Sequence, residues 1–159
     1  MNKEIGVTLV ELMVVIAIVA ITLTIGVPSM RNMIANNRSS SQAINFVASL
    51  NLARSEAVKR GSTVSMAATD GANWENGWQI WDDQNGDGNV DAGETILQTS
   101  AGLTGGNTLA AGGVTSLTYT STGRIAAVAT FTLDSASGAG YDRTIEIQPT
   151  GRVHVFGET

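Results

Sequence analysis

The sequence predicts an α+β fold, in which one long N-terminal helix packs on a C-terminal antiparallel β-rich domain. Three observations support it: an apolar run near the N-terminus, an apolar stripe at helical spacing, and short alternating segments from residue 62 onward. The chain has 159 residues, 43% of them hydrophobic, which suits one domain with a modest core. We expect four parts: residues 1–6, an apolar helix over 7–27, its amphipathic continuation over 28–61, and a β-rich domain over 62–159.

The apolar helix is a candidate membrane span. Sixteen of the 21 residues from Val7 to Val27 are apolar, and the only charged one is Glu11. About 20 such residues cross the hydrocarbon core of a bilayer as a helix. A cleavable secretory signal would end at a small-residue site after a shorter apolar run. A plain signal anchor would leave Glu11 unexplained.

Glu11 indicates that this span has a second role. A carboxylate within a bilayer costs about 2.5–3.5 kcal/mol to insert, so we expect it to have a cationic partner. The span itself contains no cation. If the chain were cut after Gly6, Val7 would carry a free amine, and Glu11 of one subunit could pair with the amine of a neighbouring subunit. The pairing would turn the carboxylate into an assembly contact.

The helix is expected to continue past Pro28, which removes one helical hydrogen bond and kinks the helix. Gly61 is a natural stop, and Lys59 and Arg60 suit the negative helix end. We interpret Arg54, Glu56, Lys59 and Arg60 as a solvated face on which both Lys59 and Arg60 pair with Glu56. The stripe that faces the domain consists of Ala43, Phe46, Val47, Leu50, Ala53 and Ala57.

These N-terminal residues carry a family resemblance. The run Gly6-Val7-Thr8-Leu9-Val10-Glu11-Leu12, after a short leader with Lys3, resembles the processing site of type IV pilins and pseudopilins. In that family a prepilin peptidase cuts after the glycine and methylates the new N-terminal residue, which is usually phenylalanine and here is Val7. The stretches 33–38 and 50–61 are similar to the GspH/FimT branch, and most similar to its T-type fimbrial biogenesis minor pilin.

The resemblance implies a type IV pilin-like fold and a structural role rather than an enzymatic one. The chain would be a minor pilin that primes or caps a type IV pilus; the alternative is the H-type minor pseudopilin of type II secretion. It would cross the bacterial inner membrane once, with its C-terminal domain in the periplasm, and then enter a pilus or pseudopilus. Its partners would be other pilins or pseudopilins through the N-terminal helix, the prepilin peptidase and the inner-membrane assembly platform.

From residue 62 the hydrophobic period changes to that of strands. Stretches 101–113 and 136–140, rich in Gly and Ala, are expected to be loops. Thr122-Gly123-Arg124-Ile125 recurs as Thr150-Gly151-Arg152-Val153, which predicts two similar glycine turns, each leading into an arginine at a strand start. The expected strands are residues 63–68, 77–82, 95–98, 116–120, 127–134, 144–148 and 152–156.

DNA binding is a lesser alternative function. Some T-type minor pilins bind DNA during uptake through a Gly-Arg-x-Arg element, and the corresponding run here is Gly151-Arg152-Val153-His154. Histidine replaces the second arginine and is mostly neutral at pH 7. A weak basic patch would form if Arg124, Arg143 and Arg152 are neighbours in space. The net charge of −5 argues against nucleic acid as the main partner.

An acidic segment, residues 83–94, matches the twelve-residue calcium-loop pattern. Its expected flanks are strands rather than the helices of an EF-hand, so a plain acidic hairpin is the alternative and is slightly favoured. No other metal or catalytic site is indicated, since the chain has no cysteine and one histidine, His154. The calcium ligands would be Asp83, Asn85, Asp87, Asn89, Asp91 and Glu94.

Overall fold

The structure is a computed structural model that describes residues 8–157 of the chain. These residues form two compact units, divided between Ala35 and Asn36. We call residues 8–35 the helical unit and residues 36–157 the domain. The expected cleavage site between Gly6 and Val7 lies outside the described residues.

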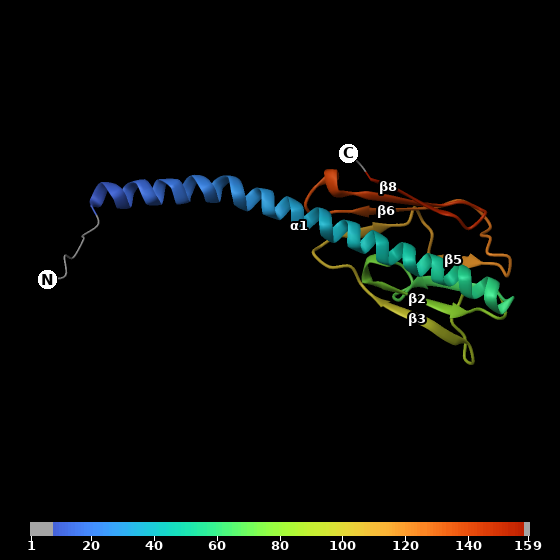
Figure 1. Cartoon of the computed structure of the whole chain (residues 1–159). Helices are drawn as coiled ribbons and strands as arrows, with labels where there is room; N and C mark the ends of the chain where they lie inside the picture. The colour runs from blue at the N-terminus through green and yellow to red at the C-terminus, as the bar shows by residue number, and fades with distance from the viewer. Residues whose placement is uncertain (1–7, 158–159) are drawn as a thin grey trace. The chain divides into compact units, whose positions relative to one another are not determined.

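One helix, α1 (Leu9–Arg60), contributes to both units. Pro28 lies inside it, and the helix continues beyond this residue. At the C-terminal end Gly61 has a positive φ of 66°, and its N–H donates to the Ala57 carbonyl, as in a glycine C-cap. The predicted long helix and its stop are therefore confirmed, and Figure 1 shows the final turns of α1 alongside the strands of the domain.

Eight strands follow α1 and form two antiparallel sheets. The first sheet has the order β3-β2-β1-β5 and the second has the order β4-β6-β7-β8. Two short 3-10 helices, η1 (Trp74–Asn76) and η2 (Ala139–Tyr141), connect strands. The strands are β1 (Val64–Ala68), β2 (Gly77–Asp82), β3 (Thr95–Ala101), β4 (Thr108–Ala110), β5 (Ser116–Tyr119), β6 (Ala129–Asp134), β7 (Arg143–Ile147) and β8 (Val153–Gly157).

Seven of these strands fall where the sequence predicts them, with ends shifted by up to three residues. β4 lies in a stretch that we expected to be a loop. The strand has three residues, and only Leu109 is buried, between two exposed neighbours, so its hydrophobic alternation is too brief to be recognised in the sequence. The expected strand start at Arg124 is also wrong, since β6 begins five residues later, at Ala129.

The predicted apolar stripe of α1 lies in the core between the helix and the two sheets. Phe46 is fully buried, and its ring lies 5.0 Å from that of Trp78 in β2 and 4.9 Å from that of Phe131 in β6. Trp74 completes the cluster at 5.1 Å from Phe131, and its indole N–H donates to the Val114 carbonyl. Because Phe46 touches aromatic rings from both sheets, it joins the helix to the whole β-structure.

Candidate functional site

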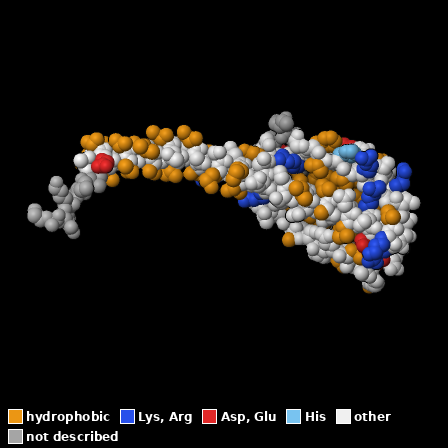
Figure 2. All heavy atoms as spheres, in the orientation of Figure 1, with side chains coloured by type: hydrophobic (Ala, Val, Ile, Leu, Met, Phe, Trp, Pro, Cys, Tyr) orange, Lys and Arg blue, Asp and Glu red, His pale blue; other side chains and the backbone are white. Residues whose placement is uncertain are grey.

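The helical unit presents an apolar surface with no covering partner among residues 8–157. Leu9–Arg60 contains a window long and apolar enough to cross a membrane, and none of that window is buried. Figure 2 shows hydrophobic side chains along this stretch. The hydroxyls of Thr22 and Thr24 donate to carbonyls one turn earlier, so they need no outside partner. Such a surface requires lipid or other apolar helices around it.

Glu11 lies in the first turn of α1, because the described helix begins at Leu9 rather than at the expected residue 7. Its backbone N–H donates to the Thr8 hydroxyl at 3.2 Å. No salt bridge within residues 8–157 involves its carboxylate. The negative charge suits the positive N-terminal end of a helix, but within an apolar environment the carboxylate still needs a cation from elsewhere.

The two Thr-Gly-Arg repeats form matching turns that lie against each other. In each turn the glycine N–H donates to the carbonyl three residues earlier, from Gly123 to Thr120 and from Gly151 to Gln148. Both glycines have positive φ, 71° and 77°. A Cβ on Gly151 would lie 2.0 Å from the Gly123 carbonyl oxygen, so only glycine permits this approach.

Arg54 holds the two turns together. Its Nε donates to the Gly123 carbonyl at 3.0 Å, and its Nη2 donates to the Thr150 carbonyl at 3.1 Å. Our interpretation of Arg54 as part of a solvated face was therefore wrong. Glu56, in contrast, pairs with Lys59 at 3.2 Å and Arg60 at 2.7 Å as expected. The sequence did not reveal this role, because Arg54 binds main-chain carbonyls, which no sequence pattern identifies.

The structure brings together two of the three candidate DNA-binding arginines. Arg124 and Arg152 follow the paired glycines, and both side chains are exposed. Arg143 lies apart from them. The second turn follows Ile147, the last residue of β7, and Arg143 is the first residue of this strand, about 13 Å away along it. Its guanidinium donates to Asn36 and Ser40 of α1. Figure 2 shows several basic side chains gathered at one end of the domain.

The acidic segment 83–94 connects β2 and β3, so its flanks are strands, as predicted. Asp83 is fully buried and accepts hydrogen bonds from the Ser65 hydroxyl and from the N–H groups of Gly86 and Gly88. The two Glu94 oxygens accept backbone N–H groups of Gln84 and Asp91. This network closes the segment with its own donors.

Several of the calcium ligands named from the sequence hydrogen-bond to one another. Asn85 donates its amide N–H to the Asp91 carboxylate, and the Asn85 side-chain oxygen accepts the Asp87 N–H. Asn89 donates its own N–H to the Asp87 carboxylate. Among the described residues no three His, Asp or Glu side chains are grouped to hold a metal ion. Calcium binding and the plain acidic hairpin therefore both stay untested predictions.

Comparison with known families decides the class of the chain. Residues 42–151 match the family described as Type II transport protein GspH, and residues 1–27 match the prokaryotic N-terminal methylation motif. The chain belongs to the GspH family. The second match covers the predicted processing segment, including Gly6, Val7 and Glu11.

Solved structures of a minor pilin are similar to this GspH-family chain. The type IV minor pilin FimU of Pseudomonas aeruginosa PAO1, in space group P21, matches with a TM-score of 0.65 and 25% identity over 77% of this chain and 90% of that one. A second crystal form, P65, matches with a TM-score of 0.61 and 26% identity over 75% and 93%. No curated protein sequence matches the chain.

These matches confirm the predicted pilin-like fold and the GspH/FimT-type minor pilin resemblance. They describe the chain as a minor pilin or pseudopilin, a class of structural subunits that interact with other pilins. The methylation motif and the exposed apolar helix together indicate membrane anchoring. The family matches do not bear on Arg54, which the structure alone identifies as the residue that joins the two Gly-Arg turns.

Proposed function

We propose that this GspH-family chain is a minor pilin that primes or caps a type IV pilus after prepilin peptidase cleaves it behind Gly6. The observation that carries the proposal is the likeness to FimU, a type IV minor pilin, over nine-tenths of that chain. A structural subunit also accounts for the uncovered apolar surface of the helical unit. Under this proposal the chain has no enzymatic role.

The proposed mechanism is helix packing guided by one ion pair. Cleavage gives Val7 a free amine, and Glu11 of one subunit pairs with the Val7 amine of its neighbour. Both charges lie among apolar helices, so neither is satisfied until subunits align. The apolar residues from Leu9 to Val27 then pack against like helices as they leave the lipid. The inner-membrane assembly platform would receive the subunit with its domain in the periplasm.

A role as the H-type minor pseudopilin is the alternative, and the family description favours it directly, since it names a type II transport protein. The mechanics would be the same, but the short filament would push secreted proteins outward. The two roles are separated by deleting the gene in its host. We expect fewer surface pili and unchanged levels of secreted proteins, and the intact gene should restore the number of pili. Normal pili together with a block in secretion would instead establish the pseudopilin role.

DNA capture is a lesser candidate, supported by the contact between the two Gly-Arg turns. Arg124 and Arg152 would provide the phosphate contacts, and Arg143 would not take part because it lies at the other end of β7. Phosphate contacts weaken steeply as salt rises. A gel shift with duplex DNA over a salt series tests this role, with an R124A/R152A variant and Arg143→Ala as its matched control. The absence of a shift at low salt would exclude it.

A further inference from the structure

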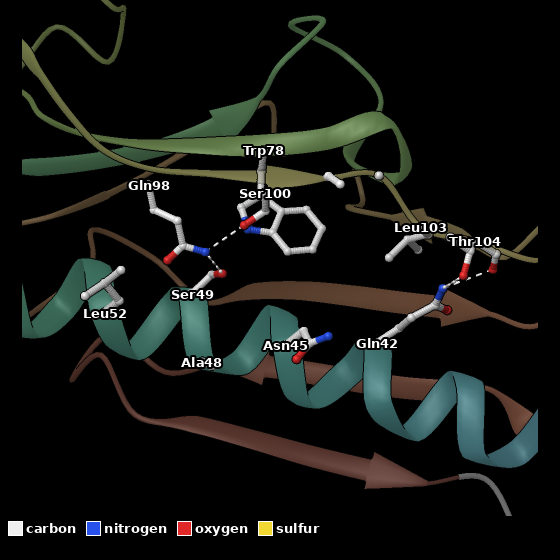
Figure 3. Close-up of a pocket in the computed structure, with 12 residues that line it drawn as sticks. Gln42, Asn45, Ala48, Ser49, Leu52, Trp78, Gln98, Ser100, Leu103 and Thr104 are labelled. Carbon is white, nitrogen blue, oxygen red and sulfur yellow. Dashed lines mark hydrogen bonds between the residues drawn. The ribbon is translucent and has the colours of Figure 1, made fainter.

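A groove in the domain runs between α1 and the edge strand β3. It has a volume of about 550 Å³, within the range of ligand pockets. Figure 3 shows Gln98 and Ser100 of β3 facing Ser49 of α1, where the Gln98 amide donates to both hydroxyls. Further along, the Gln42 amide donates to the carbonyl and hydroxyl of Thr104. None of the twelve lining residues is charged, so the groove suits an uncharged occupant.

One donor in this groove lacks a partner. Trp78 lines the groove and is 97% buried, since its exposed fraction is 3%. Its indole Nε1 makes no hydrogen bond within the described structure. The Trp74 indole of the same aromatic cluster, in contrast, donates to the Val114 carbonyl. A buried N–H without a partner costs about 1–3 kcal/mol, so this wall of the groove is less stable than its packing alone would make it.

The edge of β3 beside the groove has free main-chain groups. The Thr69 N–H donates to the Gly77 carbonyl, which directs the polar groups of Gly77 toward β1. The main-chain N–H and C=O groups of successive strand residues point to opposite edges of the strand. The groups of Trp78 and Ile80 therefore face β3 and bond to their register partners Ser100 and Gln98.

The groups of the alternate residues, Thr99 and Ala101, therefore face outward from the sheet. The regular part of the edge starts at Gln98, because the register shift opposite Ile80 and Trp81 leaves Leu97 unpaired. β3 carries no charged residue and no proline, which are usual protections of a sheet edge. This edge is thus open to an additional strand.

We propose that the groove binds an extended, uncharged segment of a neighbouring pilin subunit, which pairs with the outward groups of Thr99 and Ala101. Strand addition supplies main-chain hydrogen bonds, while the groove receives alternate side chains of the added segment. This inference rests on the proposed function, because it takes the occupant from another subunit of the same filament.

The test uses the full-length chain, fluorescently labelled, in detergent micelles. The probes are immobilised twelve-residue peptides that tile the soluble parts of the host's other pilins, each with a scrambled version. We expect binding to a subset of peptides whose bound core has no charged residue. Thr99→Pro removes an outward N–H and keeps the main-chain β2–β3 bonds, although the Gln79 side chain loses the Thr99 hydroxyl as its acceptor. It should weaken binding by about tenfold or more.

Ser116→Pro is the matched control, because Ser116 lies on the opposite edge of the same sheet, and it should retain wild-type binding. Asn45→Trp, an exposed helix position lining the groove, should weaken binding without touching β3. Melting curves check that each variant folds, and if Thr99→Pro does not fold, the comparison of Asn45→Trp with the wild type decides.

Binding no stronger than to scrambled peptides, or equal binding by Asn45→Trp and wild type, would overturn the proposal. Entry of the chain into filaments without peptide binding would reject this inference alone, whereas peptide binding without entry would reject the proposed function.

Discussion

Two main-chain carbonyls determine the role of Arg54. Its planar guanidinium directs donors to Gly123 and Thr150, which are 27 residues apart in sequence but adjacent in the fold. Lys59, on the same helix, pairs with Glu56, and its side chain is 75% exposed. From the sequence, we interpreted both side chains as part of a solvated helix face. Their difference arises from two turns that are distant from the helix in sequence and that the fold brings against Arg54.

Replacing Arg54 with alanine should lower the free energy of unfolding by about 2 kcal/mol, because two carbonyls lose charged donors. Lys59→Ala is the matched control and should change it by less than about 0.5 kcal/mol. Denaturant unfolding of the purified chain, followed by tryptophan fluorescence, measures both. Equal effects of the two substitutions would show that Arg54 does not hold the turns.

The hydrogen bonds of Asp70 lead us to expect that acid destabilises the domain. Its carboxylate accepts the Asn73 and Ala72 N–H groups and the side-chain amides of Asn73 and Asn76. These bonds, led by that from the Asn73 N–H, hold its pKa well below the ordinary value of 3.8.

A lowered pKa stabilises the fold above the unfolded-state value, and this contribution is lost as pH falls through the folded-state value. The melting temperature of the wild type should therefore fall on acidification from about pH 5 to about pH 2, and that of Asp70→Asn should fall less. Parallel pH profiles for the two proteins would contradict this role.

At the scale of elements, the hydrophobic periodicity and the glycines that end helices and form turns predict most of the fold. Phe46 and Leu50 mark the buried face of α1, and Gly61 marks its end. β4 escaped detection because three residues with one buried side chain show no period. The end of β3 at Ala101 was also missed, since its last residues alternate little in hydrophobicity and are held mainly by pairing with β2. Such pairings depend on long-range contacts and so leave a weak local signal.

The segment between β2 and β3 is anchored by Asp83. Alanine at this position would leave one hydroxyl and two backbone N–H donors without their acceptor, and should cost about 3 kcal/mol of stability. Asp87→Ala, at an exposed site in the same segment, should cost about 1 kcal/mol or less. Thermal melting compares them, and a similar loss for both would refute the anchoring role.

The same segment should fold without calcium. Both Glu94 oxygens already accept backbone N–H groups, so we expect calcium to leave the melting temperature unchanged. A site with a dissociation constant of about 10 µM would add about 2.7 kcal/mol of stability at about 1 mM calcium. Calorimetric titration gives a second reading. A melting shift that Glu94→Gln abolishes would restore the calcium-loop interpretation.

For the whole molecule, two surfaces with different chemistry serve one proposed role. The helical unit offers apolar side chains and one carboxylate, and the domain offers an uncharged groove beside an open sheet edge. The first surface could be predicted from the sequence, because a largely apolar run whose single charged residue is Glu11 is a local pattern. The groove could not, since it joins residues such as Gln42 and Gln98 that only the fold brings together.

The central claim is that Glu11 aligns the chain with a neighbouring subunit in a filament. The most direct test expresses the wild type, Glu11→Ala and the control Glu75→Ala in the host and measures each chain in sheared filaments and in the inner membrane. We predict that all three insert in the membrane and that the wild type and control reach the filaments with methylated Val7 at the N-terminus. Glu11→Ala should be depleted there by at least about tenfold, since breaking a buried ion pair costs about 3–5 kcal/mol. Equal incorporation of Glu11→Ala would contradict the account.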